Sequence, residues 1–501
     1  MRKTLALSLL LGIMAGLAFP PINLGFLAYG ILIPLLFLLD QAGLKQTIGR
    51  SYLAGLFYFL FTVFWISWAT VPGFFGALFV LPLYFIIFST LYYFFRTRLG
   101  FAAIFTVPFI WVGVEYLLSL SEFCFPWVYL GYTQTHFLPL LQYADVTGVY
   151  GVSFWVAVIN ICLFIFGKRT EKRRLIALVT LALFAVPGIF GWAKMQLLKP
   201  SEESTRIALI QGNVSVHEKW QGQYKLNNFQ RYKSLSKTAL AQEPNLIVWP
   251  ETALPFHLRG DPRYNRAMHH FADSANAAIL TGAIDYSFNM DGSYEHYNAA
   301  LAFRPFKQDI QHYHKQKLAP FSERVPYKHY FPFNVLKDLL YDLGIGDYSI
   351  GKEIINFKFG GRSSADSTTF DAGVAICYES VFPDHVRRFV KSGANALIVI
   401  TNDGWFGPTN GPFQHKQMAV FRAIENRRAI ARCANTGISC FIDPAGRVRQ
   451  QTRLNREAVI VDDVQLRDSL TFYAKYGNVF AQLVVGLLAI AVIVTIIKRK
   501  V

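Results

Sequence analysis

The sequence predicts a polytopic α-helical membrane protein with about eight transmembrane helices, into which an α/β domain is inserted on the outer side of the membrane. Its composition is 53% hydrophobic and only 16% charged, whereas soluble domains carry about 25% charged residues. Long apolar segments fill the first 194 residues and return near the C-terminus. The stretch between them alternates between strand and helix patterns. Part of the net charge of +17 comes from basic residues in short clusters between apolar runs, which favours loops at a membrane over a surface for nucleic acid.

Residues 1–194 are predicted to form an N-terminal membrane domain of seven transmembrane helices. Residues 476–501 are predicted to form a C-terminal transmembrane helix with a short cytoplasmic tail. A helix needs about 20 apolar residues to cross the hydrocarbon core, and most of the apolar segments have that length. The first segment follows two basic residues like a signal peptide, but residues 18–21 make a poor cleavage site, so we expect a retained span. The segments lie near residues 4–20, 23–40, 51–70, 74–95, 101–120, 146–167, 175–193 and 478–497.

The distribution of Lys and Arg predicts the orientation, because cytoplasmic loops carry an excess of both. Basic residues occur before the first segment and after the second, fourth, sixth and eighth, whereas the loops near 71–74 and 121–145 have none. This pattern places both termini in the cytoplasm and residues 195–475 outside it. The basic residues are Arg2, Lys3, Lys45, Arg50, Arg96, Arg98, Lys168, Arg169, Lys172, Arg173, Arg174, Lys498, Arg499 and Lys500.

Three acidic residues, Glu115, Glu122 and Asp145, lie in or beside the fifth and sixth apolar segments. Ionisable groups at membrane depth are costly and often functional. The alternative is that all three lie at the outer interface, where water reaches them. The five cysteines form neither a CxxC pair nor a metal-ligand spacing, so we expect no disulfide framework and no metal site.

The extracytoplasmic region, residues 195–475, is predicted to be a layered α/β domain. Short apolar runs favour strands at 206–211, 246–249, 278–283, 298–303, 311–318, 373–378, 396–401, 438–442 and 458–461. Helical periodicity falls near 223–241, 262–276, 381–392 and 414–433. The segment 326–362 is rich in Tyr, Phe, Pro and Gly without a clear period, and we expect a lid there rather than a linker.

Three stretches of this domain could supply a base, a cation and a thiol. Cys377 ends a strand, where a nucleophile would be presented, and a thiol needs a base or a cation nearby to react near neutral pH. Glu251 could be that base, and Lys315 could stabilise a tetrahedral oxyanion beside a backbone N–H such as that of Tyr378. Each residue alone has an ordinary structural interpretation, and their joint occurrence favours catalysis. Glu323 and Glu379 are further carboxylates that could orient the lysine or a substrate amine.

These stretches resemble the Glu-Lys-Cys triad of the nitrilase (carbon–nitrogen hydrolase) superfamily. Over nearly its full length the chain resembles the apolipoprotein N-acyltransferase family of the bacterial inner membrane. The matching motifs are QGN at 211–213 with Trp220, WPET at 249–252, Lys315 with LAPFSE at 318–323, CYE at 377–379, TNDGWFG at 401–407, GP at 411–412 with QH at 414–415, and Arg432 with NTG at 435–437. One departure is Ser322, where the family usually has Gly.

The resemblance implies a nitrilase-like αββα catalytic domain and a multi-pass protein of the inner membrane. By position, Cys377 would be the nucleophile, Glu251 the general base and Lys315 the stabiliser of the intermediate. The family transfers an acyl chain from a phospholipid, through a thioester, to the α-amino group of a diacylglyceryl-modified apolipoprotein. It implies no cofactor, no nucleic acid and a monomeric enzyme. Supporting or substrate-binding roles would fall to Glu323, Tyr378, Glu379, Trp220 and Trp405.

Several assignments stay open at this level. Lys317 would share a strand face with Lys315, and only the spacing to Glu323 favours Lys315. His415 is expected to cap or pack rather than catalyse. The arginines at 422, 427, 428 and 432 could bind a lipid phosphate, but a solvated helix face paired with Glu425 is favoured. The aromatic residues of the expected lid either contact acyl chains or pack in the core; they are Trp405, Phe406, Tyr327, Tyr330, Phe331 and Phe333.

Two other functions are compatible with parts of the pattern. A membrane-anchored amidase would use the same triad with water as the second nucleophile, although eight spans exceed what an anchor requires. A transporter with an exported regulatory domain would need polar residues inside the spans, which hold few.

Overall fold

The computed structural model describes the chain except for residues 1, 217, 289, 343, 361–368 and 498–501. The chain divides into two compact units. We call Met1–Leu198, Thr409–Gln417 and Tyr476–Val501 the helical unit, and Lys199–Pro408 with Met418–Lys475 the α/β unit. Thr409–Gln417 falls inside the predicted catalytic range in sequence but groups with the helices, so helix α14 (Gly411–Asn426) contributes residues to both units.

Each apolar segment of the helical unit contains helix, but several segments are broken. The second splits into a 3₁₀ turn and a short α-helix, and the fourth is interrupted at Leu81 and Pro82, where α5 ends and α6 begins. Proline lacks the N–H that a continuous helix needs. The helices are α1 (Arg2–Ala18), η1 (Gly25–Gly30), α2 (Ile33–Leu39), α3 (Leu44–Thr62), α4 (Ile66–Ala69), α5 (Val71–Val80), α6 (Leu83–Leu99), η2 (Gly100–Thr106), α7 (Val107–Ser119), η3 (Leu130–Gln134), η4 (Leu138–Leu141), α8 (Ala144–Lys168), η5 (Thr170–Lys172), α9 (Arg173–Leu197) and α16 (Val479–Ile497).

Four helical ranges among the described residues are long and apolar enough to cross a membrane. They are Val71–Ser119, which covers 49 residues, Ala144–Lys168, Thr170–Leu197 and Val479–Ile497. Helix α1 has 17 residues, slightly fewer than a full span requires. The structure therefore supports a membrane protein with several spans, and the number eight stays a prediction. The basic cluster at 498–500 lies outside the described residues.

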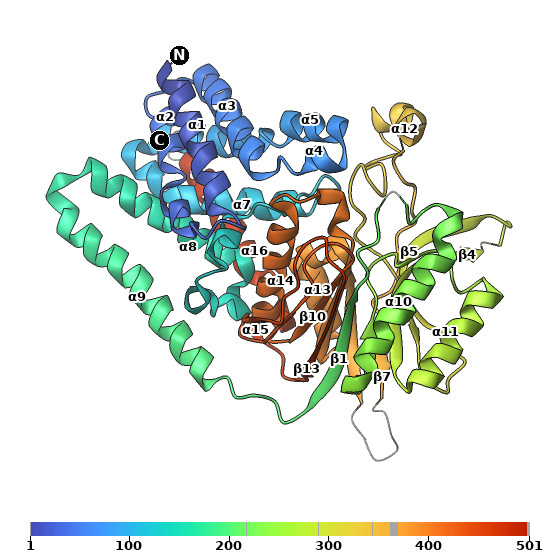
Figure 1. Cartoon of the computed structure of the whole chain (residues 1–501). Coiled ribbons are helices and arrows are strands. Elements are labelled where there is room, and N and C mark those ends of the chain that lie inside the picture. The colour runs from blue at the N-terminus through green and yellow to red at the C-terminus, as the bar shows by residue number, and fades with distance from the viewer. Residues whose placement is uncertain (1, 217, 289, 343, 361–368, 498–501) are drawn as a thin grey trace. The chain divides into compact units, whose positions relative to one another are not determined.

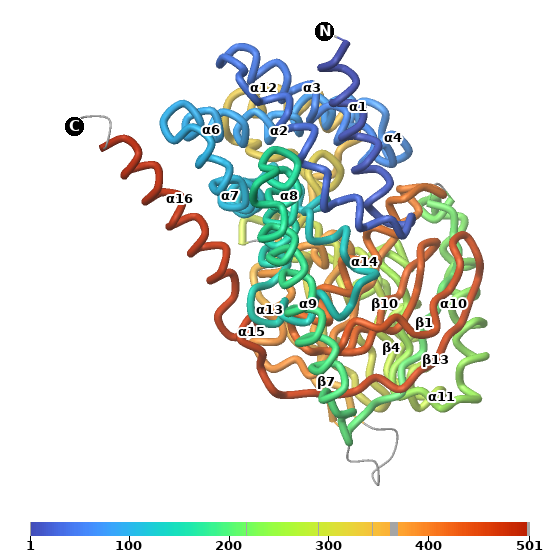
Figure 2. The backbone as a smooth tube through the Cα atoms, turned by 90° about the vertical axis from the view of Figure 1, so that its left-hand side faces the viewer, coloured from blue at the N-terminus to red at the C-terminus, as the bar shows by residue number. Residues whose placement is uncertain are grey.

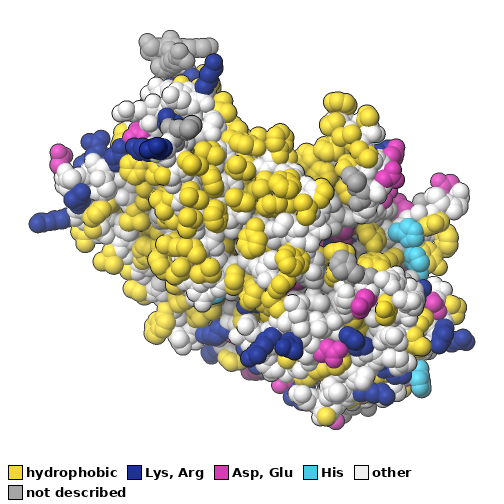
Figure 3. Space-filling view, turned by 45° about the horizontal axis from the view of Figure 1, so that its top comes forward, with side chains coloured by type: hydrophobic (Ala, Val, Ile, Leu, Met, Phe, Trp, Pro, Cys, Tyr) yellow, Lys and Arg dark blue, Asp and Glu magenta, His cyan; other side chains and the backbone are white. Residues whose placement is uncertain are grey.

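Helix packing in this unit relies on small residues at close contacts. Helix α1 packs along α3, and α16 runs beside α7 (Figure 2). Gly113 of α7 faces Leu488 of α16 so closely that a Cβ would lie 3.2 Å from the leucine, as is typical of helices that meet without a water-driven force. The outward side chains of α9 and α16 are large and apolar, and Figure 3 shows hydrophobic side chains gathered over much of the visible surface.

Glu115 and Asp145 lie in or beside these helices and have well-defined partners. Glu115 accepts hydrogen bonds from the Trp111 indole and the Leu130 N–H, both at 2.9 Å. Asp145 forms an ion pair of 2.6 Å with Lys194. His415 is buried and its ring packs on Trp127, as expected for a packing residue.

The α/β unit contains two sheets. The seven-stranded sheet has the order β13-β1-β2-β4-β5-β6, with β3 paired to β4, and the six-stranded sheet has the order β12-β11-β10-β9-β8-β7. The first comprises β1 (Ser204–Gln211), β2 (Leu246–Val248), β3 (Leu254–His257), β4 (Ala278–Phe288), β5 (Tyr294–Phe303), β6 (Gln311–His314) and β13 (Ala458–Gln465). The second comprises β7 (Asn356–Phe359), β8 (Phe370–Ile376), β9 (Ala396–Thr401), β10 (Ile430–Ala434), β11 (Cys440–Ile442) and β12 (Val448–Arg449).

The sheets pack face to face between helices, in the αββα order that the resemblance implied (Figure 1). Helices α10 (Lys225–Ala239) and α11 (Pro262–Ala275) cover the first sheet, and α13 (Pro383–Lys391) packs against β8 of the second. Contacts of β1 with β10 and of β5 with β8 join the sheets. Strands β1, β2 and β4 run parallel, as do β8, β9 and β10, so each sheet has strands whose carboxyl ends meet at one edge. The remaining elements are η6 (Gly222–Tyr224), η7 (Leu240–Gln242), α12 (Phe333–Asp342), η8 (Cys377–Val381), η9 (Asp403–Phe406) and α15 (Phe472–Tyr476).

Two sequence expectations were wrong here. The helix expected over 414–433 ends at Asn426, and Ile430–Ala434 is the parallel strand β10. The arginines expected on a solvated face are buried. Arg422 forms an ion pair with Glu425 at 2.7 Å inside the unit, and Arg432 pairs with Asp403 at the same distance. Periodicity alone could not separate a short buried strand from the end of a helix.

Candidate active site

Three predicted residues lie where strands end. Glu251 follows β2 after Trp249 and Pro250, Lys315 is the first residue after β6, and Cys377 is the first residue after β8. Cys377 has a backbone φ of +49°, in the left-handed region that residues with a Cβ rarely adopt. Such a turn holds the side chain at the end of the strand, and strained backbone of this kind is common at functional positions.

Lys315 forms ion pairs with two predicted carboxylates. Its ammonium donates to Glu251 Oε1 at 3.1 Å and to Glu323 Oε1 at 2.8 Å. The lysine side chain is 2% exposed, Glu251 7% and Glu323 13%, so the pairs are desolvated and geometrically fixed rather than solvated surface contacts. Lys317, the alternative lysine, instead lies over the Phe382 ring at 5.4 Å. Lys315, and not Lys317, is the lysine that contacts Glu251 and Glu323 in the structure.

The Glu251 carboxylate is surrounded by donors. The Asn298 amide donates to Oε1 at 2.8 Å, and the Asn402 N–H donates to Oε2 at 3.0 Å. Burial alone would raise the pKa of Glu251, but Lys315 and the hydrogen bond from Asn298 outweigh it and hold the pKa below its usual value. Burial would lower the pKa of Lys315, but the Glu251 and Glu323 carboxylates raise it well above its usual value. Glu251 is therefore an ionised acceptor and Lys315 a permanent cation at neutral pH.

The thiol of Cys377, unlike the Glu251 carboxylate and the Lys315 ammonium, is uncharged at neutral pH. Burial and the Glu251 charge raise its pKa far above that of a free thiol, with Lys315 acting against them. The thiol is consequently protonated at neutral pH, and it becomes a nucleophile only by giving its proton to a neighbouring base. Glu251 is the ionised carboxylate whose charge acts most strongly on it.

Glu379 connects the strand end that carries Cys377 with the segment that carries Lys315. Its Oε2 accepts the N–H of Ile376 at 2.8 Å, and its Oε1 accepts the N–H of Gln316 at 2.6 Å and the hydroxyl of Tyr313 at 2.7 Å. The side chain is fully buried. Because β6 and β8 belong to different sheets, this carboxylate fixes two functional groups across the sheet interface. Tyr378 packs edge-on against Phe382 and is also buried.

The turn that carries Glu323 explains how Ser322 is tolerated. Phe321, not Ser322, takes the left-handed conformation, with φ of +56°. Ser322 donates its N–H to the Ala319 carbonyl at 3.3 Å, and the Glu323 carboxylate accepts the Ala319 N–H at 2.8 Å. The turn closes without glycine-like backbone freedom at position 322.

The two predicted tryptophans lie at the surface of the α/β unit. Trp220 is 42% exposed and Trp405, in η9, is 40% exposed. Helix α12, within the expected lid segment, also presents apolar side chains outward, including Val335 and Leu339. Residues 343, 361 and 362 of that segment lie outside the described ranges. These aromatic and apolar side chains are therefore exposed rather than part of the core.

Sequence reasoning missed three polar residues of the site. Asn298 holds Glu251 and Glu323 together, Asn402 donates its N–H to Glu251, and Lys219 is buried next to the base. Asn298 could have been noticed as the one polar residue opening an otherwise apolar strand run, and Lys219 directly precedes Trp220. The Asn402 contact is made by backbone, which no side-chain pattern reveals.

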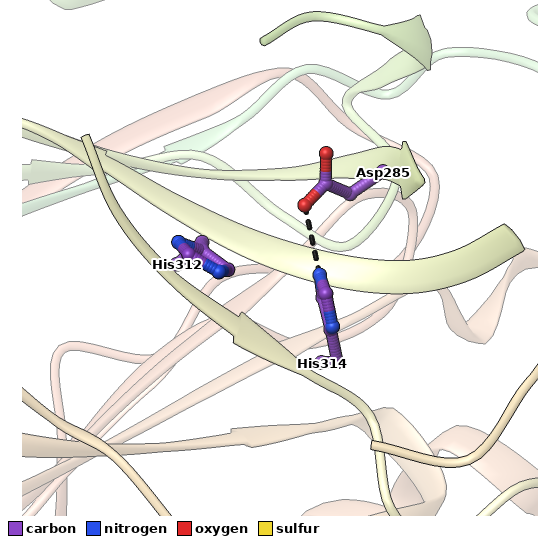
Figure 4. Close-up of side chains that lie close together, drawn as sticks. All are labelled: Asp285, His312 and His314. Carbon is purple, nitrogen blue, oxygen red and sulfur yellow. Dashed lines mark hydrogen bonds and ion pairs between the residues drawn. The ribbon is translucent and has the colours of Figure 1, made fainter. Parts of the chain in front are cut away.

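A second cluster of ionisable groups lies elsewhere in the α/β unit (Figure 4). His314 Nε2 is 2.8 Å from Asp285 Oδ2, and His312 lies beside them on β6. Arg259 contacts both oxygens of Asp285, at 3.0 and 3.1 Å. A guanidinium bound in this way already neutralises the carboxylate and opposes a metal cation at the same oxygens. We interpret this cluster as a structural ion network.

Comparisons with known proteins agree with the two units. Residues 11–162 match the apolipoprotein N-acyltransferase N-terminal domain, and residues 206–471 match the carbon–nitrogen hydrolase domain. The chain is 33% identical to an apolipoprotein N-acyltransferase of Chlorobaculum tepidum, over 100% of this chain and 98% of that one. It is also 33% identical to an apolipoprotein N-acyltransferase of Geobacter metallireducens, over 96% of this chain and 93% of that one.

A solved structure of Saccharomyces cerevisiae Nit3, a member of the nitrilase superfamily, aligns with 53% of this chain and 92% of its own at 17% identity and a TM-score of 0.39. The two domain matches follow one another along the chain, and the relatives cover it almost completely. The chain belongs to the apolipoprotein N-acyltransferase family.

Proposed function

We propose that the protein transfers a fatty acyl chain from a phospholipid, through a thioester on Cys377, to the α-amino group of the N-terminal diacylglyceryl-cysteine of apolipoproteins. This would be the last step of lipoprotein maturation. The observation that carries the proposal is the buried contact of Lys315 with Glu251 and Glu323 beside a protonated thiol, in a chain whose full-length relatives are named for this transfer.

In the first step, Cys377 Sγ attacks the carbonyl carbon of the phospholipid ester while Glu251 takes the thiol proton. The charge that develops on the carbonyl oxygen is stabilised by the Lys315 ammonium, a fixed donor in a desolvated site. The ester C–O bond then breaks, and the lysophospholipid oxygen takes the proton from Glu251. The products are a thioester on Cys377 and a free lysophospholipid, with Glu251 ionised again.

In the second step, the neutral α-amine of the apolipoprotein attacks the thioester carbon. Glu251 accepts a proton from the attacking nitrogen, the C–S bond breaks, and the cysteine sulfur recovers its proton from Glu251. An amide is formed and the enzyme returns to its starting state. Excluding water from the thioester favours aminolysis over hydrolysis, and the outward apolar side chains of α12 and the exposed Trp220 and Trp405 support a cover of lipid or protein during this step.

The membrane setting suits substrates that carry acyl chains. Large apolar side chains face outward from α9 and α16, so lipid is their natural solvent. The start of α1 and the end of α16 lie at the same end of the helical unit (Figures 1 and 2), which agrees with the charge pattern. We propose a monomeric, multi-pass enzyme of the bacterial inner membrane, with both termini in the cytoplasm and the α/β unit in the periplasm.

Intact-mass analysis of the membrane-extracted protein tests this function. Wild type incubated with phospholipid should gain one acyl mass that hydroxylamine removes, and Cys377→Ala should gain none. A diacylglyceryl-cysteine peptide should then discharge the adduct and appear as the N-acylated product. An adduct that only water discharges would instead establish the alternative, a membrane-anchored amidase-like hydrolase. If wild type forms no adduct with any phospholipid, the nucleophile assignment is wrong.

A further inference from the structure

Lys219 is a second lysine of the site, and neither step of the proposed transfer uses it. Its side chain is buried. Its ammonium donates to the Thr252 carbonyl at 3.3 Å and, in a shorter bond, to the Thr252 hydroxyl. Burying an ammonium costs several kcal/mol unless partners compensate it. A lysine kept in this position beside the candidate base therefore needs a reason.

The residue that Lys219 holds is the one directly after Glu251. Thr252 has a φ of +45°, in the left-handed region. The turn also presses against β4, because a Cβ on Gly282 would lie 2.5 Å from the Thr252 nitrogen. A turn that is strained on one side and tightly packed on the other keeps its shape only if its polar groups are fixed. Lys219 fixes the carbonyl and the hydroxyl of this turn.

Lys219 also completes the charge balance of the site. Two carboxylates, Glu251 and Glu323, face one firmly charged lysine, Lys315. The charge of Lys219 helps to hold the pKa of Glu251 low, after Lys315 and Asn298. In return, Glu251 and Cys377 are the charged and titratable groups that act on Lys219. Burial nevertheless dominates and lowers the pKa of Lys219 to about 8. The lysine is charged at neutral pH and loses its charge at mildly alkaline pH.

We propose that Lys219 is a positioning residue of the acyl transfer: it fixes the turn that aims Glu251, and its positive charge favours the negative charge that forms when Cys377 gives up its proton. This role rests on the proposed function, because it acts on the base of that reaction. It differs from the role of Lys315, which faces the reacting carbonyl oxygen.

The test is the rate of acyl-adduct formation without acceptor peptide, followed by mass from about pH 6 to about pH 10, a range that brackets the titration of a perturbed lysine. We expect the wild-type rate to fall as the pH passes about 8, where Lys219 loses its proton. Lys219→Arg keeps its charge over this whole pH range, so the fall in its rate of adduct formation should move to higher pH. Lys219→Met should be slower by about tenfold at neutral pH, equivalent to one unit of pKa, and should show no fall near pH 8.

Two further variants separate the two parts of the role. Thr252→Val removes the hydroxyl acceptor but keeps the charge, so it should slow the reaction and retain the fall near pH 8. Lys237→Met removes an exposed lysine of α10 and should match wild type throughout. Thermal unfolding of each variant shows whether it folds. If Lys219→Met does not fold, the comparison of Lys219→Arg with wild type decides.

Equal rates and profiles for wild type and Lys219→Met would overturn the role of Lys219 while leaving the transfer intact. A fall at the same pH in Lys219→Arg and wild type would overturn it as well. Absence of an adduct in wild type at every pH would overturn the proposed function itself, and the role with it.

Discussion

Glu251 and Asp285 are both buried carboxylates of the α/β unit that bind cations near the ends of strands, yet they do different things. Glu251 pairs with Lys315 beside a protonated thiol, whereas Asp285 pairs with Arg259 and His314. Lysine offers a compact point charge that leaves carboxylate lone pairs available, and the guanidinium fork occupies both oxygens. Under the proposed function, a buried ion pair takes part in catalysis only where a neighbouring group can give the carboxylate a proton.

Glu251→Gln should have the largest effect of the changes that test this comparison. Gln keeps the shape but can accept from only one of Asn298 and the Asn402 N–H, which donate to different carboxylate oxygens, and it cannot take the thiol proton. We expect adduct formation to slow by about 10²–10⁴-fold, the usual contribution of a general base. Time-resolved intact mass measures it. A rate within threefold of wild type would mean that another group deprotonates Cys377.

Glu379→Gln should come next, because it disturbs the support of the same region. The amide nitrogen of Gln cannot accept the contacts made by the carboxylate oxygen that it replaces, and hydrogen bonds to a charged group contribute about 1.5–3 kcal/mol. We expect a loss of stability near the top of that range, about 3 kcal/mol, together with slower acylation. Differential scanning fluorimetry and the adduct assay are read together. Unchanged acylation in a destabilised variant would mean that Glu379 stabilises the fold but does not position Cys377.

Asp285→Asn should reverse this pattern by lowering stability while leaving acylation unchanged. Removing one partner of a buried ion pair costs about 3–5 kcal/mol. Arg259 is 33% exposed and can return to water, so we expect about 2 kcal/mol, or roughly 2–4 °C in the unfolding midpoint for each kcal/mol. His312→Ala, which removes the half-exposed neighbour, is the matched control and should shift the midpoint less. A loss of acylation in Asp285→Asn would end the distinction between the two regions.

The pH dependence of stability tests whether Asp285 is ionised in the folded protein. Burial would raise the pKa of Asp285, but the His314 hydrogen bond and Arg259 hold it below its usual value. A lowered folded-state pKa contributes stability that is complete above the unfolded pKa of about 3.9 and is lost as the pH falls through the folded value. The unfolding midpoint of wild type should therefore drop more steeply below about pH 4 than that of Asp285→Asn, which cannot titrate there.

An exposed ion pair provides the smallest effect and calibrates the others. Arg206 contacts Asp463 at 2.9 Å between paired strands, but both side chains are about half exposed. Such pairs contribute about 0.2–1 kcal/mol after screening. Asp463→Asn should lower the free energy of unfolding by at most about 1 kcal/mol and leave acylation as in wild type. A larger shift would mean that the α/β unit responds to charge at its surface as strongly as in its interior.

The sequence was sufficient for those features that leave a local pattern. Strand runs before Glu251 and Cys377 predicted that both residues follow a strand, and the spacing from Lys315 to Glu323 predicted which lysine contacts that carboxylate. The strands β3, β7, β10 and β12 were not predicted, because short runs of two to five residues carry little periodicity. Helix α14 was extended too far for the same reason.

What could not be predicted depends on burial and long-range contact. The arginines after residue 420 read as a polar helix face, yet Arg422 and Arg432 are buried against acidic partners. Lys219 and Glu251 are 32 residues apart in sequence and share the site only because Thr252 turns the chain toward the loop before α10. Lys219 and Glu251, like Arg432 and Asp403, lie too far apart for a local window of sequence to contain both, and the burial of Arg422 leaves no local pattern.

The Glu379 contacts also bear on when the enzyme becomes active during folding. Cys377 and Lys315 follow strands of separate sheets, and the Glu379 carboxylate accepts the N–H of the residue beside each, Ile376 and Gln316. A partly folded chain, in which only one sheet has formed, therefore carries a thiol without its base and cation in place. The three groups come together only when both sheets have assembled. We therefore expect the thiol to react with lipid in the folded domain and not in a partly folded or damaged one.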